Sequence, residues 1–144
     1  MTRSLLDVNV LLALLDSDHV DHDQAHRWLE EEGIGHGWAS CAITENGFVR
    51  VISQPRYPSP VTPSVAVQLL RTATEDSDHA FWPCDVRLLD PTIVDPDRLL
   101  GHRQITDAYL LALATAHGGR LVTFDRGLDA SAVPHAASTS LVVL

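Results

Sequence analysis

The longest apolar stretch of the chain lies near its beginning, in residues 5–15, where only Asp7 and Asn9 are polar. Leaving such a run in water would forfeit about 25 cal/mol for each Å² of exposed apolar surface, so it must be buried. It is also shorter than the roughly 20 apolar residues that a membrane-spanning helix needs. The pattern predicts a short central strand, Ser4–Leu6, that turns at Asp7 into a buried helix, Val8–Leu15.

Helical periodicity and short apolar runs alternate along the rest of the chain. The 3.6-residue pattern predicts helices over Asp18–Glu32, Ala42–Ile52, Ser64–Glu75 and Gln104–His117. The expected inward residues are Ala25, Trp28 and Leu29 in the first of these helices, and Val65, Leu69, Leu70 and Ala73 in the third. Apolar runs bounded by turn residues predict strands at Gly37–Ser40, His79–Pro83, Arg120–Phe124 and Thr139–Leu144.

Two segments do not fit either pattern. Ser53–Pro63 contains four prolines and therefore cannot be a regular helix or an inner strand. We expect an extended loop there, and its Arg56 and Tyr57 either line a groove or belong to a plain connector. Asp85–Gly101 is polar and interrupted by prolines, which predicts a loop with one short helix.

Four carboxylates share an unusual placement relative to these elements. Asp7 and Asp125 follow buried strands, whereas Glu45 and Asp107 begin helices and point along their apolar stripes. In a parallel sheet with right-handed crossovers, strand ends and the starts of the following helices lie on one edge. Each acid alone is also explained as a turn or first-turn residue. The four together predict a single acidic pocket.

Such a pocket needs a counter-charge. Clustered carboxylates repel one another, and the usual remedies are protonation or a divalent cation. Hard oxygen ligands without Cys or His favour Mg²⁺ or Mn²⁺. A cation held in this way activates water and offsets charge on a phosphate, so the implied chemistry is hydrolysis of a phosphodiester.

Composition narrows this hypothesis. The 144 residues suit one domain, 1–144, and the net charge of −9 argues against a protein that only coats nucleic acid. All ten basic residues are arginines, and four of them, Arg50, Arg56, Arg103 and Arg126, are candidates for phosphate contacts or for surface salt bridges. Cys41 and Cys84 match no zinc motif or disulfide framework, so we expect reduced thiols. No signal-peptide pattern is present, and the expected location is the cytoplasm.

A histidine cluster stands outside this pocket. His19, His22 and His26 lie at helical spacing among four aspartates. Such a group either binds a transition metal or forms a solvated face. It lacks the compact ligand spacing of a zinc motif, which favours the solvated face.

Four short motifs in one order carry a family resemblance. The chain resembles PIN-domain ribonucleases, and within them the toxin subunits of VapBC toxin–antitoxin pairs, over nearly its whole length. The motifs are Leu5-Leu6-Asp7-Val8-Asn9, Thr44-Glu45-Asn46-Gly47-Phe48-Val49-Arg50, Ile105-Thr106-Asp107-Ala108-Tyr109-Leu110-Leu111-Ala112-Leu113-Ala114 and Leu121-Val122-Thr123-Phe124-Asp125-Arg126.

The resemblance implies a three-layer α/β/α sandwich with a central, mainly parallel sheet of four to five short strands. It implies a Mg²⁺- or Mn²⁺-dependent endoribonuclease toxin acting on tRNA or rRNA, a homodimer, and a cognate antitoxin that covers the active site. It further implies that the acidic centre comprises Asp7, Glu45, Asp107 and Asp125, that Asp7, Asp107 and Asp125 hold the metal, and that Asn9 and Thr106 support them.

Two other classes remain as alternatives. Phosphoryl-transfer enzymes of the haloacid-dehalogenase or receiver type also place an aspartate after a first buried strand. Both rely on a lysine, which this chain lacks, and the first type uses a second aspartate where this chain has Asn9. A non-catalytic PIN-like interaction module is the other alternative, and the intact set of four acids argues against it.

Overall fold

The computed structural model describes residues 2–33 and 35–144. Five strands in this part of the chain form one sheet in the order β3-β2-β1-β4-β5, and every neighbouring pair is parallel. The strands are β1 (Ser4–Leu6), β2 (Trp38–Cys41), β3 (His79–Trp82), β4 (Arg120–Thr123) and β5 (Leu141–Val143).

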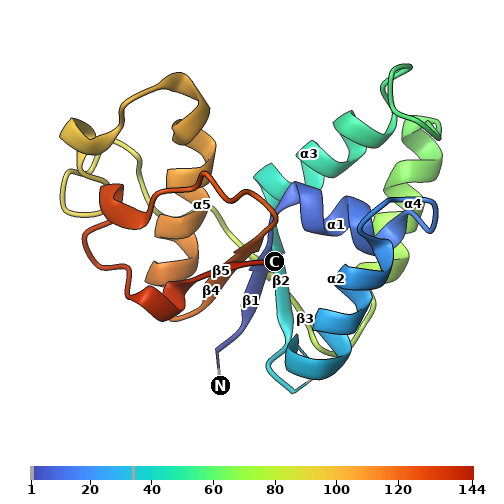
Figure 1. Cartoon of the computed structure of the whole chain (residues 1–144), viewed down its shortest axis with the longest axis horizontal. Helices are drawn as coiled ribbons and strands as arrows, with labels where there is room; N and C mark the ends of the chain where they lie inside the picture. Colours follow the sequence, from blue (N-terminus) through green and yellow to red (C-terminus); the bar gives the residue numbers. More distant parts are fainter. Residues whose placement is uncertain (1, 34) are drawn as a thin grey trace.

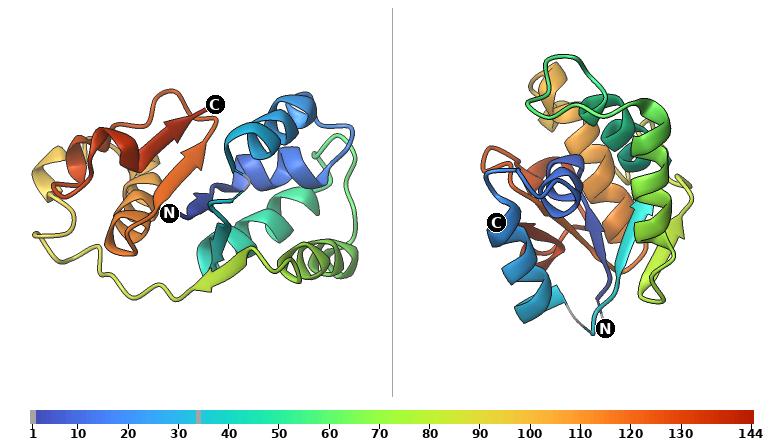
Figure 2. Two further views of the ribbon diagram at one scale, coloured as in Figure 1. Left: turned by 90° about the horizontal axis from the view of Figure 1, so that it is seen from below. Right: turned by 90° about the vertical axis from the view of Figure 1, so that its right-hand side faces the viewer.

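Helices cover both faces of this sheet, as Figures 1 and 2 show. α5 packs on one face, and the helices of the first half of the chain pack on the other. The predicted three-layer α/β/α sandwich is therefore confirmed. The helices are α1 (Val8–Leu15), α2 (His22–Trp28), α3 (Ala42–Ile52), α4 (Pro63–Thr74) and α5 (Ile105–Ala116).

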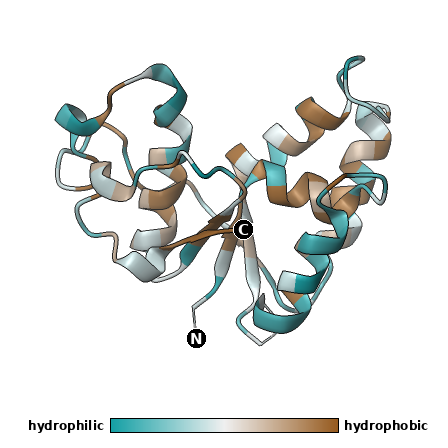
Figure 3. Ribbon diagram, viewed as in Figure 1, coloured by the Kyte–Doolittle hydropathy of each residue, from teal (hydrophilic) through white to brown (hydrophobic). Residues whose placement is uncertain are grey.

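The two halves of the core follow from the alternation of side chains along the strands. Leu5 and Leu121 point toward α5, and their successors Leu6 and Val122 point toward α1 and α3. Because β1 and β4 are buried on both faces, consecutive residues in each are apolar, Leu5-Leu6 and Leu121-Val122. Figure 3 shows hydrophobic residues in the central sheet, and α2, at the periphery, as largely hydrophilic.

Most expected boundaries hold to within one or two residues, but the helix predicted from Asp18 was wrong at its start. It begins at His22 and ends in a π-helical turn, Leu29–Gly33. The residues before it are held in turns, in which the Asp16 carboxylate accepts the backbone N–H of Asp18 at 3.0 Å. Local side-chain bonding of this kind competes with helix formation.

The expected inward face of α4 was also partly wrong. Ala66 and Leu70 are buried, whereas Val65 and Leu69 are 44% and 37% exposed. The helix carries more apolar positions than its contact with α3 covers, so periodicity alone selected a stripe that was too wide.

The histidine cluster joins two helices. The His22 Nδ1 lies 2.7 Å from the carbonyl oxygen of Ala13, and the His26 Nε2 lies 3.0 Å from that of Leu14. These carbonyls belong to the last turn of α1, where helical partners are missing. His19 Nδ1 accepts the backbone N–H of Asp21 at 3.0 Å. The rings of His22 and His26 therefore dock α2 onto α1, and the ring of His19 holds the turn before α2.

The remaining expectations concern loops, thiols and membranes. The proline-rich loop is tied to the end of α1, because the Tyr57 hydroxyl donates to Asp16 Oδ2 at 2.6 Å. Both Cys41 and Cys84 are free thiols. Within the described residues, no helix combines the length and the apolar character needed to cross a membrane.

Leu111 provides a test of this core. It is fully buried between α5 and the sheet, so Leu111→Ala should lower the free energy of unfolding by about 2–5 kcal/mol through lost burial and a residual cavity. Urea denaturation of the two proteins measures the difference. Leu100→Ala is the matched control, because Leu100 is 82% exposed and its truncation should change little.

Candidate active site

Asp7 stands at the junction between β1 and α1. Its Oδ1 accepts the backbone N–H of Val8 at 2.7 Å and caps α1, while its Oδ2 accepts the hydroxyl of Thr123 at 2.7 Å. Its side chain is buried at the carboxyl edge of the sheet. Burial raises the pKa of Asp7 and the nearby charge of Asp125 adds to that rise, although the two hydrogen bonds oppose it. Asp7 is therefore both a helix cap and a buried carboxyl group.

The Thr123 hydroxyl holds three residues of this edge together. It donates to Asp7 Oδ2 and accepts both the Asn9 amide at 3.2 Å and the backbone N–H of Asp125 at 3.0 Å. Asn9 is fixed at its other end, because its Oδ1 accepts the backbone N–H of Phe124 at 3.2 Å. A single hydroxyl thus positions Asp7, Asn9 and the start of the segment that carries Asp125.

Thr123 was missed in the sequence analysis, although a signal for it exists. β1 and β4 pair in a register that aligns Leu6 with Val122, which makes Asp7 and Thr123 the next neighbours. A threonine in a buried strand needs a hydrogen-bond partner. The partner could not be named without the pairing of the strands.

Asp107 approaches this group from the first turn of α5. Burial raises the pKa of Asp107 to about 7, with further contributions from the negative charge of Asp7 and from a hydrogen bond to, and the charge of, Asp125. These effects show that the three aspartates, far apart in sequence, are close in space. Asp107 and Asp125 also line a cavity of about 290 Å³, whose rim includes Arg103.

Glu45 lies on the neighbouring part of the same edge with different partners. It is in the first turn of α3, and its Oε2 accepts the hydroxyl of Ser40 at 2.7 Å. It borders a second cavity of about 340 Å³ between α3 and α4. The structure therefore brings Asp7, Asp107 and Asp125 together and places Glu45 in a separate polar contact.

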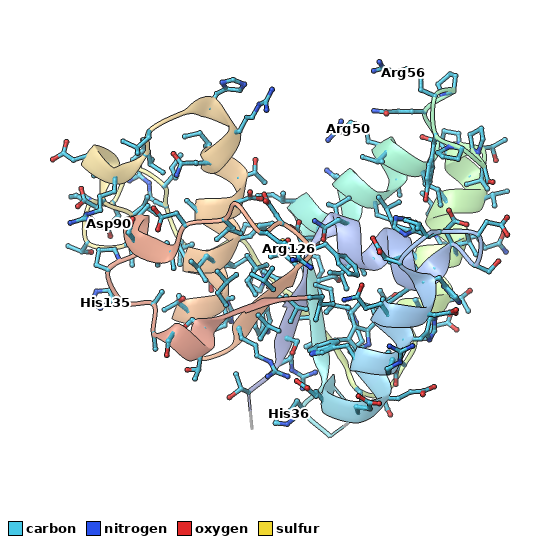
Figure 4. All side chains as sticks on the ribbon, viewed as in Figure 1. His36, Arg50, Arg56, Asp90, Arg126 and His135 are labelled. Carbon is cyan, nitrogen blue, oxygen red and sulfur yellow. The ribbon has the colours of Figure 1, made fainter. Side chains whose placement is uncertain are left out.

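The other predicted residues lie around these groups. Thr106 is exposed beside Asp107 on the first turn of α5, and Arg50, Arg56, Arg103 and Arg126 are all exposed. Figure 4 shows Arg50 and Arg56 on the side of the molecule that carries α3, and Arg126 near its middle, beyond the end of β4. Exposed arginines at these places are available for contacts with an extended polyanion.

The aspartate cluster suits a hard divalent cation. Among residues 2–33 and 35–144, no three acidic, His or Cys side chains are already arranged as a metal-binding group. The donor set is nevertheless the kind that Mg²⁺ or Mn²⁺ prefers, consisting only of carboxylate oxygens. The raised pKa of Asp107 shows that the three groups cannot all be ionised at low cost without a counter-charge.

Comparisons with known proteins agree with this architecture. The sequence signature described as "PIN domain" matches residues 4–133. Ribonuclease VapC44 of Mycobacterium tuberculosis is 58% identical over 142 residues, which cover 99% of each chain. Ribonuclease VapC39 of the same organism is 45% identical over 130 residues, covering 90% of this chain and 93% of the relative. Ribonuclease VapC38 of that organism is 41% identical over 126 residues, covering 87% and 86%.

The bonds of Thr123 predict a stability effect. Thr123→Val should lower the free energy of unfolding by about 1–3 kcal/mol, because it leaves a buried carboxylate oxygen without its donor and removes the acceptor used by Asn9 and Asp125. Urea denaturation measures the loss. Thr123→Ser keeps the hydroxyl and should lose less, so an equal loss in both variants would contradict the importance of the hydrogen bonds.

The pKa of Asp107 predicts a pH dependence of stability. The folded protein binds this proton more tightly than the unfolded chain, because the pKa rises from 3.8 to about 7 on folding. The resulting stabilisation is complete below pH 3.8 and is lost as the pH rises through about 7. Asp107→Asn should therefore make the stability less dependent on pH than it is in the wild type. Thermal unfolding of both proteins in metal-free buffer between pH 5 and pH 8 measures this dependence. An equal dependence of stability on pH in the two proteins would contradict the raised pKa of Asp107.

Proposed function

This chain belongs to the PIN-domain family and, within it, to the VapC proteins, and on that premise we propose that it is a metal-dependent endoribonuclease toxin of a type II toxin–antitoxin pair. Relatives named as ribonucleases match it at up to 58% identity over nearly its full length. The observation that carries the proposal is the convergence of Asp7, Asp107 and Asp125 at one edge of the sheet.

Asp7, Asp107 and Asp125 are the proposed ligands of Mg²⁺ or Mn²⁺. A cation bound by them would lower the pKa of a water molecule and offset negative charge on the scissile phosphate. The protein fixes the positions of these carboxylates. Asp7 is held by its cap to α1 and by Thr123, which leaves its carboxylate little freedom to turn.

The protonation of Asp107 is part of this mechanism. The pKa of Asp107 is about 7 without a cation, and a positive charge that compensates for Asp7 and Asp125 would lower this pKa, so that Asp107 would lose its proton on binding the cation. Occupation of the site is therefore coupled to the loss of a proton. Activity should accordingly rise with pH across this range.

The remaining roles concern water and RNA. Glu45 orients or deprotonates the attacking water, and Asn9 and Thr106 support the acidic centre. Exposed arginines grip the phosphates that flank the scissile bond, because contact with single-stranded RNA is largely electrostatic. We assign this role to Arg50, Arg56, Arg103 and Arg126.

Partners follow from the same proposal. The substrate is RNA, with tRNA or rRNA as the expected class, and the protein acts in the cytoplasm as a homodimer. A cognate antitoxin covers the acidic edge and suppresses cleavage. We expect a small open reading frame for it immediately upstream of the gene.

Cleavage of RNA tests the proposal directly. Purified protein incubated with total RNA should generate new 5′ ends with Mg²⁺ or Mn²⁺ and none with EDTA. Asp7→Asn should reduce cleavage at least about 100-fold, because it removes a proposed metal ligand while an asparagine still caps α1.

The matched control is Asp90→Asn. Asp90 is an exposed turn aspartate on the far side of α5 in Figure 4, and its substitution should leave cleavage unchanged. Mapping of the 5′ ends identifies the cut sites. Undiminished cleavage by a folded Asp7→Asn protein would overturn the assignment of the acidic centre.

A further inference from the structure

A second polar cluster lies on the face of the sheet opposite α5 and consists of the buried Ser40 and the half-buried Glu45 and His79. Ser40 on β2 is fully buried, and its neighbours Ala39 and Cys41 face α5, so its own side chain faces α3 and α4. Its hydroxyl lies 2.7 Å from Glu45 Oε2 and 2.8 Å from His79 Nε2. These two contacts connect the first turn of α3 to the start of β3.

The direction of both hydrogen bonds follows from the number of protons available. An ionised carboxylate only accepts, so the single hydroxyl hydrogen of Ser40 must be donated to Glu45. Ser40 can then only accept from His79, whose proton must lie on Nε2. The chain of donors runs from His79 through Ser40 to Glu45.

His79 is itself held in place by its surroundings. Its ring lies against the Trp38 indole, with ring centroids 4.4 Å apart. Burial lowers the pKa of His79, although the charges of Glu45 and Asp76 and a backbone hydrogen bond at Thr74 oppose this. The Ser40 contact requires a proton on Nε2.

We propose that His79 is a positioning residue that acts through the Ser40 hydroxyl to fix the carboxylate of Glu45 at the catalytic edge of the sheet. The inference rests on the proposed ribonuclease function, in which Glu45 acts on the attacking water. Glu45 has a long, flexible side chain, and a positioned base must hold its oxygen within hydrogen-bond reach of the water. The bond to Oε2 restricts the orientation of the carboxylate.

Kinetics on a short cleavable RNA with Mg²⁺ test this role. His79→Phe keeps an aromatic ring against Trp38 but removes the donor, and should lower kcat about 10-fold with KM within about twofold, because RNA binding is untouched. His79→Gln places an amide donor near the position of Nε2 and should restore most of kcat. An unchanged kcat in His79→Phe, or an equal loss in the Phe and Gln variants, would overturn the proposal.

Coupling between the two residues separates this role from general destabilisation. Ser40→Ala should lower kcat as much as His79→Phe does, and the double variant should be no worse than either, because all three break one chain of hydrogen bonds. Multiplicative losses would show independent effects and would overturn the proposal. His117→Phe is the matched control, since His117 also stacks on a tryptophan, Trp82, and bonds a carboxylate, Asp85, but lies at the other end of α5. It should leave kcat unchanged.

The metal-free protein gives a second, activity-independent readout. The ¹⁵N shifts of His79 should show a protonated Nε2 at neutral pH in wild type, and a ring free to change tautomer in Ser40→Ala. An unprotonated Nε2 in wild type would overturn the hydrogen-bond chain. A wild-type protein that fails to cleave RNA would count against the proposed function, whereas an active protein indifferent to His79 would count against this inference alone.

Discussion

The structure depends on keeping several carboxyl groups close together at the end of a buried sheet, where the buried Asp7 meets the half-buried Asp107 and the exposed Asp125. Asp7 is the most buried of them, and its position is fixed by a helix N–H on one side and by the Thr123 hydroxyl on the other. Two hydrogen bonds to the ionised form offset part of the cost of its burial. The same threonine hydroxyl accepts hydrogen bonds from Asn9 and from the backbone of Asp125, so one buried side chain helps to position all three residues.

This arrangement carries a conflict between stability and function. Burial, together with the charges of Asp7 and Asp125, raises the pKa of Asp107 to about 7, so protonation of this group contributes to the stability of the metal-free protein. In the proposed function, a divalent cation would replace that proton and offset the repulsion between the carboxylates. Sites of this kind are selected for what they bind, and the rest of the fold must supply the stability that they forgo.

Several surrounding elements hold the acidic edge of the sheet and its helices in position. The parallel pairing of β1 and β4 fixes the register that sets Asp7 beside Thr123. The rings of His22 and His26 contact carbonyls at the end of α1 and thereby dock α2, which gives these two histidines a structural role. Ser40 joins Glu45 to His79 on the opposite face of the sheet. Histidines thus support the helices around the acidic edge from outside it.

The sequence by itself determined the succession of strands and helices along the chain, which follows from local periodicity. It also determined the edge of the sheet at which the acids lie, which follows from the geometry of parallel sheets. It also predicted one pocket for Asp7, Glu45, Asp107 and Asp125, of which the structure groups the three aspartates and places Glu45 in a separate contact with Ser40. Only the tertiary structure revealed Thr123 as the common partner of Asp7, Asn9 and the Asp125 backbone, since the Asp7–Thr123 contact joins residues 116 positions apart at the ends of paired strands. It likewise decided that α4 buries Ala66 and Leu70 and leaves Val65 exposed, and that Glu45 bonds Ser40. Side-chain partners across elements depend on rotation and register, which a one-dimensional pattern of apolar residues does not specify.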